Sequence, residues 1–169
     1  MELMGSWLQW LSDLLVGLLG TTGLDYLVVF ASAFLAATVL PFYSEVFVVT
    51  LVLAERDPLL VWVVATVGNT LGAVVNWWLG LGLEQWREAG RVPRWMQIPD
   101  REMDRARRWY ARFGIWSLLL AWLPVGGDAL TFVAGIMRVR LLPFLLLAGF
   151  GKGARYGVVI AGALSLLPV

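Results

Sequence analysis

A proline and a carboxylate interrupt a long apolar run at the stretch Leu40–Glu45 (LPFYSE). Residues 24–54 are otherwise apolar apart from Asp25, and a single helix of that length is longer than one membrane crossing requires. Pro41 has no backbone N–H and breaks the hydrogen-bond ladder of a helix. The stretch therefore predicts two short helical arms that meet at the proline, with Glu45 at the tip of a re-entrant hairpin. Irregular backbone at that depth must be buried in protein or line a cavity.

The same arrangement returns 83 positions later in the stretch Leu123–Asp128 (LPVGGD). Leucine and proline are again followed by an acid four residues after the proline. The offset also superposes Gly68 on Gly151, Asn69 on Lys152 and Gly72 on Arg155. Each half of the chain thus reads as a broken hairpin followed by a glycine-rich span with polar residues. The expected structural residues of the two hairpin tips are Pro41, Ser44, Pro124, Gly126 and Gly127.

Composition indicates an integral membrane protein with an all-α fold. The 169 residues are 60% hydrophobic, against about 45–50% apolar residues in soluble domains. The absence of cysteine and histidine excludes disulfides, a Ser-His-Asp triad and the usual zinc ligands. No enzymatic activity, catalytic residue, cofactor, metal or nucleic-acid partner is expected.

The chain is expected to form one membrane domain, residues 1–169, in four parts. Residues 1–22 are predicted to form an interfacial helix, because Asp13 would cost about 2.5–3.5 kcal/mol inside a span. Residues 24–83 form the first repeat, which includes a span over 59–83. Residues 84–114 form a basic amphipathic segment that ends at Gly114, a candidate helix C-cap. Residues 115–167 form the second repeat.

The basic segment fixes the expected topology. Residues 84–114 hold eight arginines against five acids, so the positive-inside rule puts this segment in the cytoplasm. The second hairpin begins near Arg112 and ends near Arg138, on that same side, whereas the first hairpin enters from the opposite side. The halves are therefore predicted to be inverted repeats, an arrangement that points to a transport site near the bilayer midplane.

Charged residues inside apolar segments are the candidate transport and substrate-binding residues, because a buried charge is costly and is usually functional. Carboxylates can exchange protons, and arginine matches phosphate through its planar guanidinium group. For every such residue the alternative is structural, as a helix cap, an ion pair or a snorkelling side chain, and for Asn69 and Asn76 it is an interhelical hydrogen bond. Small residues at Gly68, Gly72 and Gly151 are expected to pack helices closely. The candidate transport residues are Glu45, Asp128, Arg112, Lys152, Arg155, Arg138 and Asn69.

Four short motifs carry a resemblance to a known family. They are Leu40–Val46 (LPFYSEV), Gly68–Ala73 (GNTLGA), Trp109–Gly114 (WYARFG) and Phe150–Tyr156 (FGKGARY). In this order and spacing the chain resembles the DedA (VTT-domain, SNARE-associated) membrane proteins over residues 26–165. The second hairpin, Pro124–Asp128 (PVGGD), is most similar to the YqaA-like branch.

This resemblance implies a polytopic bacterial inner-membrane protein with two opposed re-entrant hairpins and a role in lipid translocation, with proton coupling. Many family members carry arginines three residues before and after the second hairpin proline. This chain has Ala121 and Gly127 there. A phosphate site would therefore depend on one or more of the remaining bases, namely Arg112, Lys152, Arg155 and Arg138.

The sequence leaves three functions open. The first is flippase-like or scramblase-like transport of a lipid or lipid-phosphate headgroup, possible partners being a polyprenyl phosphate or a phospholipid. The second is transport of a small ion or a proton-linked solute, and the third is a non-transporting role in membrane assembly. Membrane lipids are the expected partners, protons a candidate coupling ion and a homo-oligomer a candidate assembly.

Overall fold

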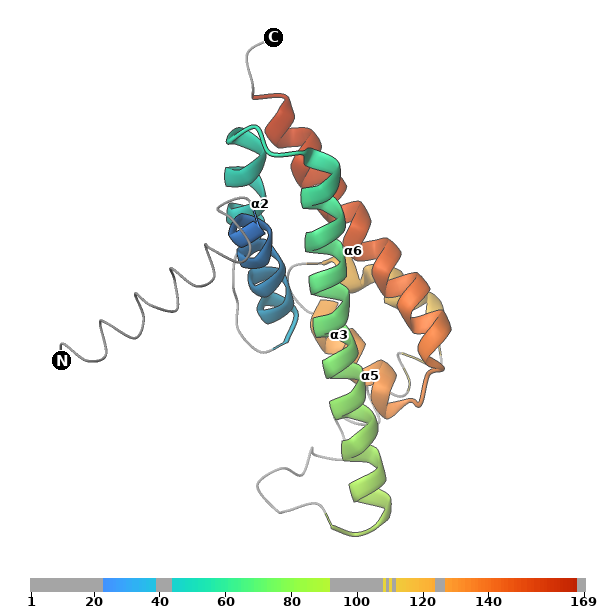
Figure 1. Cartoon of the computed structure of the whole chain (residues 1–169). Helices are drawn as coiled ribbons and strands as arrows, with labels where there is room; N and C mark the ends of the chain where they lie inside the picture. Colours follow the sequence, from blue (N-terminus) through green and yellow to red (C-terminus); the bar gives the residue numbers. More distant parts are fainter. Residues whose placement is uncertain are drawn as a thin grey trace, which may run out of the picture.

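The computed structural model describes residues 23–38, 44–91, 108, 110, 112–123 and 127–166, and in these ranges all regular structure is helical (Figure 1). The expected N-terminal helix, most of the basic segment, and Pro41, Pro124 and Gly126 lie outside the described residues. The described elements are the helix Gly23–Thr38, α2 (Ser44–Leu53), α3 (Pro58–Glu88), the 3-10 helix η2 (Gly114–Trp122), α5 (Gly127–Ile136) and α6 (Leu141–Leu164).

Helix α3 is the longest element and is long and apolar enough to cross a membrane. The Asp57 carboxylate caps its start by accepting from the backbone N–H groups of Leu59 and Leu60. Its 31 residues extend about 46 Å, beyond the roughly 30 Å hydrocarbon core. The predicted span over 59–83 is therefore correct in position but too short, since the helix continues to Glu88 and ends before Gly90 at φ +66°.

Helix α6 is the second element long and apolar enough to cross a membrane. It runs without a break through the glycine-rich residues 149–155, where the sequence appears interrupted. The glycines instead permit close contacts with neighbouring elements. A Cβ at Gly151 would lie 3.0 Å from the Leu119 carbonyl oxygen, and the Trp62 indole N–H donates to the Gly153 carbonyl at 2.7 Å.

Two ion pairs identify the ends of the helical bundle. Arg56, between α2 and α3, pairs with Asp25 at 2.6 Å near the start of the first helix. Arg138, between α5 and α6, pairs with Glu88 at the other end of α3. The short helices α2 and α5 consequently run from the middle of the bundle toward opposite ends (Figure 1).

The buried apolar residues form two separate clusters, one toward each end of the bundle. The first joins the helix Gly23–Thr38, α2, α3 and the C-terminal half of α6, through Val29, Ala33, Val48, Val52, Val61, Ala65, Tyr156, Ile160 and Ala163. The second joins α3, η2, α5 and the N-terminal half of α6, through Ala73, Leu118, Ala121, Ala134, Val139, Phe144 and Ala148. Polar side chains lie between the clusters.

The segment before Asp128 contains a 3-10 helix that the sequence did not predict. Gly114 has φ +60° directly after the helical residues 112–113, so the predicted helix end at this glycine is confirmed. η2 then places Leu118 and Ala121, three residues apart, on one buried face, as 3-10 geometry requires.

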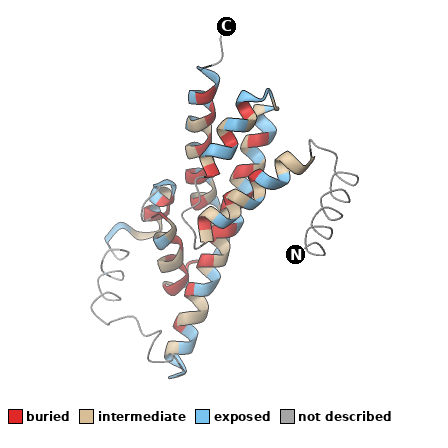
Figure 2. Ribbon diagram, turned by 90° about the vertical axis from the view of Figure 1, so that its left-hand side faces the viewer, coloured by how far each residue is buried: buried red, intermediate tan, exposed pale blue. Residues whose placement is uncertain are grey.

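Large apolar side chains cover the outside of the bundle. On α6, Leu142, Leu146, Phe150 and Val158 are each more than 60% exposed and repeat at multiples of four residues. Figure 2 shows exposed residues on the outward faces of the helices and buried ones where helices meet. An apolar face of this kind suits contact with lipid rather than with water.

Helices α3 and α5 approach each other through two glycines. A Cβ at Gly80 would overlap the Phe132 carbonyl, and a Cβ at Gly135 would overlap the Trp77 carbonyl. Because the obstructing atoms belong to the backbone, neither helix can make room without moving. This contact holds α5 against the C-terminal half of α3.

Gly80→Ala is therefore expected to lower stability by about 1–3 kcal/mol, because overpacking exceeds the roughly 1 kcal/mol that alanine gains over glycine in a helix. The matched control is Gly82→Ala, two residues along the same helix, where no atom lies within 4 Å of the added Cβ. Thermal unfolding in detergent should show a lower midpoint for Gly80→Ala and an equal or higher one for Gly82→Ala. Equal midpoints for both variants would contradict the close approach.

Candidate functional site

Five side chains form a continuous hydrogen-bonded row across the middle of the bundle. Asp128 at the start of α5 accepts from Lys152 Nζ on α6 at 3.0 Å. Lys152 also donates to Oδ1 of Asn69 on α3. Asn69 Nδ2 donates to the Tyr156 hydroxyl at 3.0 Å, which is hydrogen-bonded to the Ser44 hydroxyl of α2 at 2.8 Å. The row thus joins the starts of α2 and α5.

Lys152 is the most deeply buried charge in this row, with 1% of its surface exposed. It stands halfway along the 24 residues of α6, about 17 Å from either end of that helix. A charge at such depth is costly unless it is paired and hydrogen-bonded. Asp128 and Asn69 supply these partners.

The two asparagines of α3 bind the first helix through its backbone. Asn69 Nδ2 donates to the Ala33 carbonyl at 3.0 Å, and Asn76 Nδ2 donates to the Ala37 carbonyl at 2.6 Å. Asn76 Nδ2 also lies 3.4 Å from the hydroxyl of Thr131 on α5. Both asparagines thus make interhelical hydrogen bonds, which is the structural alternative to a transport role, and Asn69 additionally belongs to the charged row.

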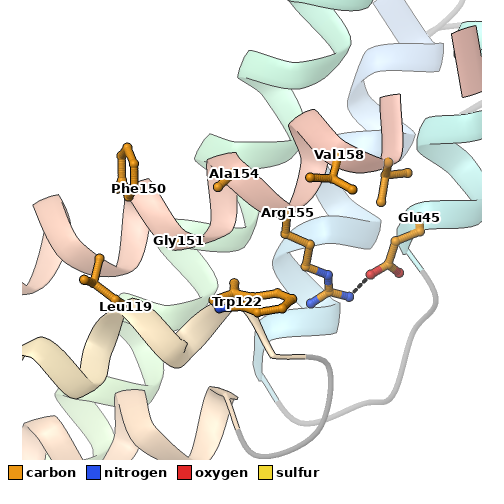
Figure 3. A pocket seen from close by; sticks show the side chains of 9 residues that line it. Glu45, Leu119, Trp122, Phe150, Gly151, Ala154, Arg155 and Val158 are labelled. Carbon is orange, nitrogen blue, oxygen red and sulfur yellow. Dashed lines mark ion pairs between the residues drawn. The ribbon is translucent and has the colours of Figure 1, made fainter. Parts of the chain in front are cut away.

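A second acid–base pair, Glu45–Arg155, lies beside the row (Figure 3). The two side chains are 24% and 21% exposed, so the pair is partly buried. It lies beside the Ser44–Tyr156 hydrogen bond, because Glu45 follows Ser44 on α2 and Arg155 precedes Tyr156 on α6. The two acids therefore pair with different bases, Glu45 with Arg155 and Asp128 with Lys152.

The Glu45–Arg155 pair lies in the wall of a cavity of about 610 Å³ between η2 and α6. Trp122 lies beside Arg155, while Phe150, Ala154 and Val158 follow one side of α6 (Figure 3). Every other described residue of the lining is apolar or glycine: Leu119, Trp122, Phe150, Gly151, Ala154, Val158 and Val159. One charged end and a long apolar wall suit a molecule that has both a charged group and a hydrocarbon chain.

The bundle does not bring every predicted site residue to this cavity. Arg138 forms an exposed ion pair with Glu88 at the end of the bundle. Arg112 is exposed, with its guanidinium 5.7 Å from the centroid of the Phe113 ring. Arg155 is thus the predicted base that lines the cavity, while Lys152 is held in the buried row.

The glycines predicted to pack helices do lie at close contacts. A Cβ at Gly68 would lie 2.6 Å from the Phe30 carbonyl oxygen, and one at Gly72 would overlap the Phe34 carbonyl. At Gly127 a Cβ would lie 2.6 Å from the Ala121 carbonyl oxygen. Ala121 and Gly127, the two positions at which the family resemblance implies arginine in many members, therefore pack against each other, and this backbone leaves no room for a side chain at Gly127.

The sequence reasoning missed three residues, Tyr156, Thr131 and Trp122. Tyr156 could have been found, because it follows Lys152 by four residues and so shares its face of α6. Thr131 donates to the Asp128 carbonyl at 2.6 Å, and its spacing of three residues from Asp128 is the corresponding signal. No sequence pattern pointed to Trp122 as a site residue, because its position depends on how η2 meets α6.

A second cavity, of about 500 Å³, opens between the C-terminal half of α3 and α5, with Trp78, Trp86, Gln85 and Phe132 in its wall. The part of its lining that the structure describes carries no charged side chain. Among the described residues, no group of three acids could hold a metal ion.

Comparison with known proteins gives a consistent family assignment. The VTT domain matches residues 11–164 of the chain. "Inner membrane protein YqaA" of Escherichia coli (strain K12) is 38% identical over 133 residues, 78% of this chain and 86% of the relative. An uncharacterized protein of Haemophilus influenzae is 36% identical over 138 residues, 75% of this chain and 80% of the relative.

A more distant relative carries a functional name. "Undecaprenyl phosphate transporter A" of Staphylococcus aureus is 20% identical over 109 residues, 62% of this chain and 54% of the relative. No solved structure gives a significant match.

Replacement of Lys152 tests the buried row. Lys152→Met should lower stability by about 1–3 kcal/mol, because it leaves the buried Asn69 amide oxygen without its donor. Adding Asp128→Asn should recover part of this loss, since no unpaired carboxylate then remains. The matched control is Arg138→Met, which breaks an exposed ion pair worth at most about 1 kcal/mol. Thermal unfolding in detergent would contradict the account if Lys152→Met and Arg138→Met were equally stable.

Proposed function

The chain belongs to the VTT-domain (DedA) family of membrane proteins, and we propose that it moves a phosphate-bearing lipid headgroup across the inner membrane through the Glu45–Arg155 cavity. The observation that carries this proposal is an ion pair set in an otherwise apolar cavity wall. The relative named undecaprenyl phosphate transporter A supports a lipid-phosphate substrate at the level of the family.

Arg155 is the binding group for the phosphate. Its guanidinium presents several N–H donors in a plane and matches two phosphate oxygens at once. The apolar residues along η2 and α6 receive the first part of the hydrocarbon chain, while Phe150 and Val158, both more than 70% exposed, border the cavity toward lipid. A headgroup can therefore enter while its tail stays in the bilayer.

Glu45 competes with the headgroup for Arg155. Among the described residues of the lining there is one cation and one carboxylate, so an anionic headgroup that displaces Glu45 removes the counter-charge that this carboxylate has there. In an apolar wall an unpaired carboxylate favours its protonated form. Headgroup binding is accordingly accompanied by uptake of one proton at Glu45. When the Glu45–Arg155 pair forms again, the headgroup and the proton are both released.

The two halves of the chain act as inverted repeats with re-entrant hairpins. Three observations support this arrangement: the equal order of elements in the halves, the opposite directions of α2 and α5, and the contact of Asn69 with Lys152. These two residues are equivalent under the offset of 83, so their contact is the one expected near a pseudo-two-fold axis. Transport sites of inverted-repeat proteins lie near such an axis at mid-membrane.

The alternative of a small-solute transporter uses the same two carboxylates. The long apolar wall of the cavity favours a lipid, because a small hydrophilic solute gains nothing from Phe150, Val158 and Val159. A role in assembly alone would give no function to the partly buried Glu45–Arg155 pair.

Replacement of the ion pair tests the proposal in reconstituted vesicles. Fluorescent phosphatidic acid, phosphatidylethanolamine and undecaprenyl phosphate are compared for movement between leaflets. Arg155→Gln is expected to slow transport at least about tenfold, because it removes a charge-assisted hydrogen bond worth about 1.5–3 kcal/mol. Arg155→Lys should retain part of the rate, and Glu45→Gln should remove its dependence on a proton gradient.

The matched control is Arg140→Gln, an exposed arginine at the start of α6 that should transport as the wild type does. Unchanged lipid movement in Arg155→Gln and Glu45→Gln would refute transport through this cavity. Flux of inorganic phosphate without lipid movement would favour the solute transporter.

A further inference from the structure

We propose that Tyr156 is a positioning residue that couples the two acid–base pairs, so that the Asp128–Lys152 pair controls how Arg155 binds its ligand. The inference rests on the proposed function, since it concerns the same anion-binding cavity. Neither the family match nor the relatives assign a role to this tyrosine.

The Asn69 amide has a defined orientation. Its Oδ1 accepts from Lys152, so its Nδ2 is the atom that faces Ala33 and Tyr156. Both ends of the amide are engaged in a site where Asn69 is 3% exposed. The position of the Lys152 ammonium group therefore determines where the amide presents its N–H groups.

Tyr156 carries this orientation from α3 to α2. Its hydroxyl accepts from Asn69 at 3.0 Å and is bonded to Ser44 at 2.8 Å. The residue is 1% exposed, so solvent does not compete for these bonds. In a buried network each hydrogen bond depends on the others, and loss of one leaves its partners unsatisfied.

The Ser44–Tyr156 bond is connected to the Glu45–Arg155 pair by adjacency along the chain. Ser44 precedes Glu45 at the start of α2, and Tyr156 follows Arg155 on α6. The Ser44–Tyr156 bond thus fixes the separation of the two backbones that carry the Glu45–Arg155 pair. A change at Asp128 that shifts Lys152 is transmitted through Asn69 and Tyr156 to the distance between Glu45 and Arg155.

A double-mutant cycle on ligand binding tests this coupling. The full-length protein in detergent is titrated with dioctanoyl phosphatidic acid, and dioctanoylglycerol serves as the uncharged control. The Kd is measured for the wild type, Tyr156→Phe, Asp128→Asn and the double variant. Tyr156→Phe removes only the hydroxyl. The fold-change in Kd caused by Asp128→Asn is expected to differ by about threefold or more between the wild type and Tyr156→Phe. If the two sites were independent, the two fold-changes would agree within about twofold.

Two further double-mutant cycles with Asp128→Asn provide a second test and a control. Ser44→Ala breaks the same connection from the α2 side and should reproduce the non-additivity, even where Tyr156→Phe fails to fold. Tyr26 belongs to the first helix and packs against the first apolar cluster, outside the row, so the cycle of Tyr26→Phe with Asp128→Asn should be additive. Thermal unfolding identifies the variants that remain folded.

The outcomes separate the two claims. Non-additivity with Tyr156→Phe or Ser44→Ala, together with additivity for Tyr26→Phe, supports the coupling. Additive effects in all three cycles, with phosphatidic acid bound by the wild type, overturn the role of Tyr156 and leave the proposed function standing. If the wild type binds phosphatidic acid no better than dioctanoylglycerol, the proposed function fails, and the coupling fails with it.

Discussion

The ammonium group of Lys152, held at mid-depth in an apolar bundle, is the constraint on which the rest of the structure depends. It is 1% exposed, so its charge is tolerable only because Asp128 and Asn69 bind it. Those partners come from α5 and α3, and neither helix can move away without leaving a buried charge unpaired. The polar layer that separates the two apolar clusters is arranged around this one cation.

The burial of Lys152 also explains how the two bases differ. Lys152 donates to Asn69 and Asp128 within the row, whereas Arg155 faces a cavity of about 610 Å³ with Glu45 as its counter-ion. Under the proposed function, an incoming anion takes the place of Glu45 at Arg155, whereas Lys152 keeps its two partners. Helix α6 then carries an interhelical contact and an anion-binding group three residues apart.

Much of the fold and part of the site follow from sequence pattern alone. Apolar runs, prolines and the offset of 83 predict the order of the helices, and family motifs lead to the assignment now shown by the VTT-domain match. The partner of each base did not follow from the sequence, because it depends on how α2 and α5 meet α6. The 3-10 form of η2, which brings Trp122 to the cavity, was missed for the same reason. The close approach of Gly127 to the Ala121 carbonyl gives a physical reason why an arginine would not fit at position 127.

The most direct test of the account is the protection of a single thiol in the cavity. The natural chain has no cysteine, so Ala154→Cys introduces one reactive group into the cavity wall. Its labelling rate by a maleimide in lipid vesicles should fall when undecaprenyl phosphate or phosphatidic acid is added, and stay unchanged with diacylglycerol. Leu146→Cys, on the exposed face of the same helix, should be unaffected. Equal labelling of the Ala154→Cys thiol with and without lipid phosphate would contradict headgroup binding at Arg155.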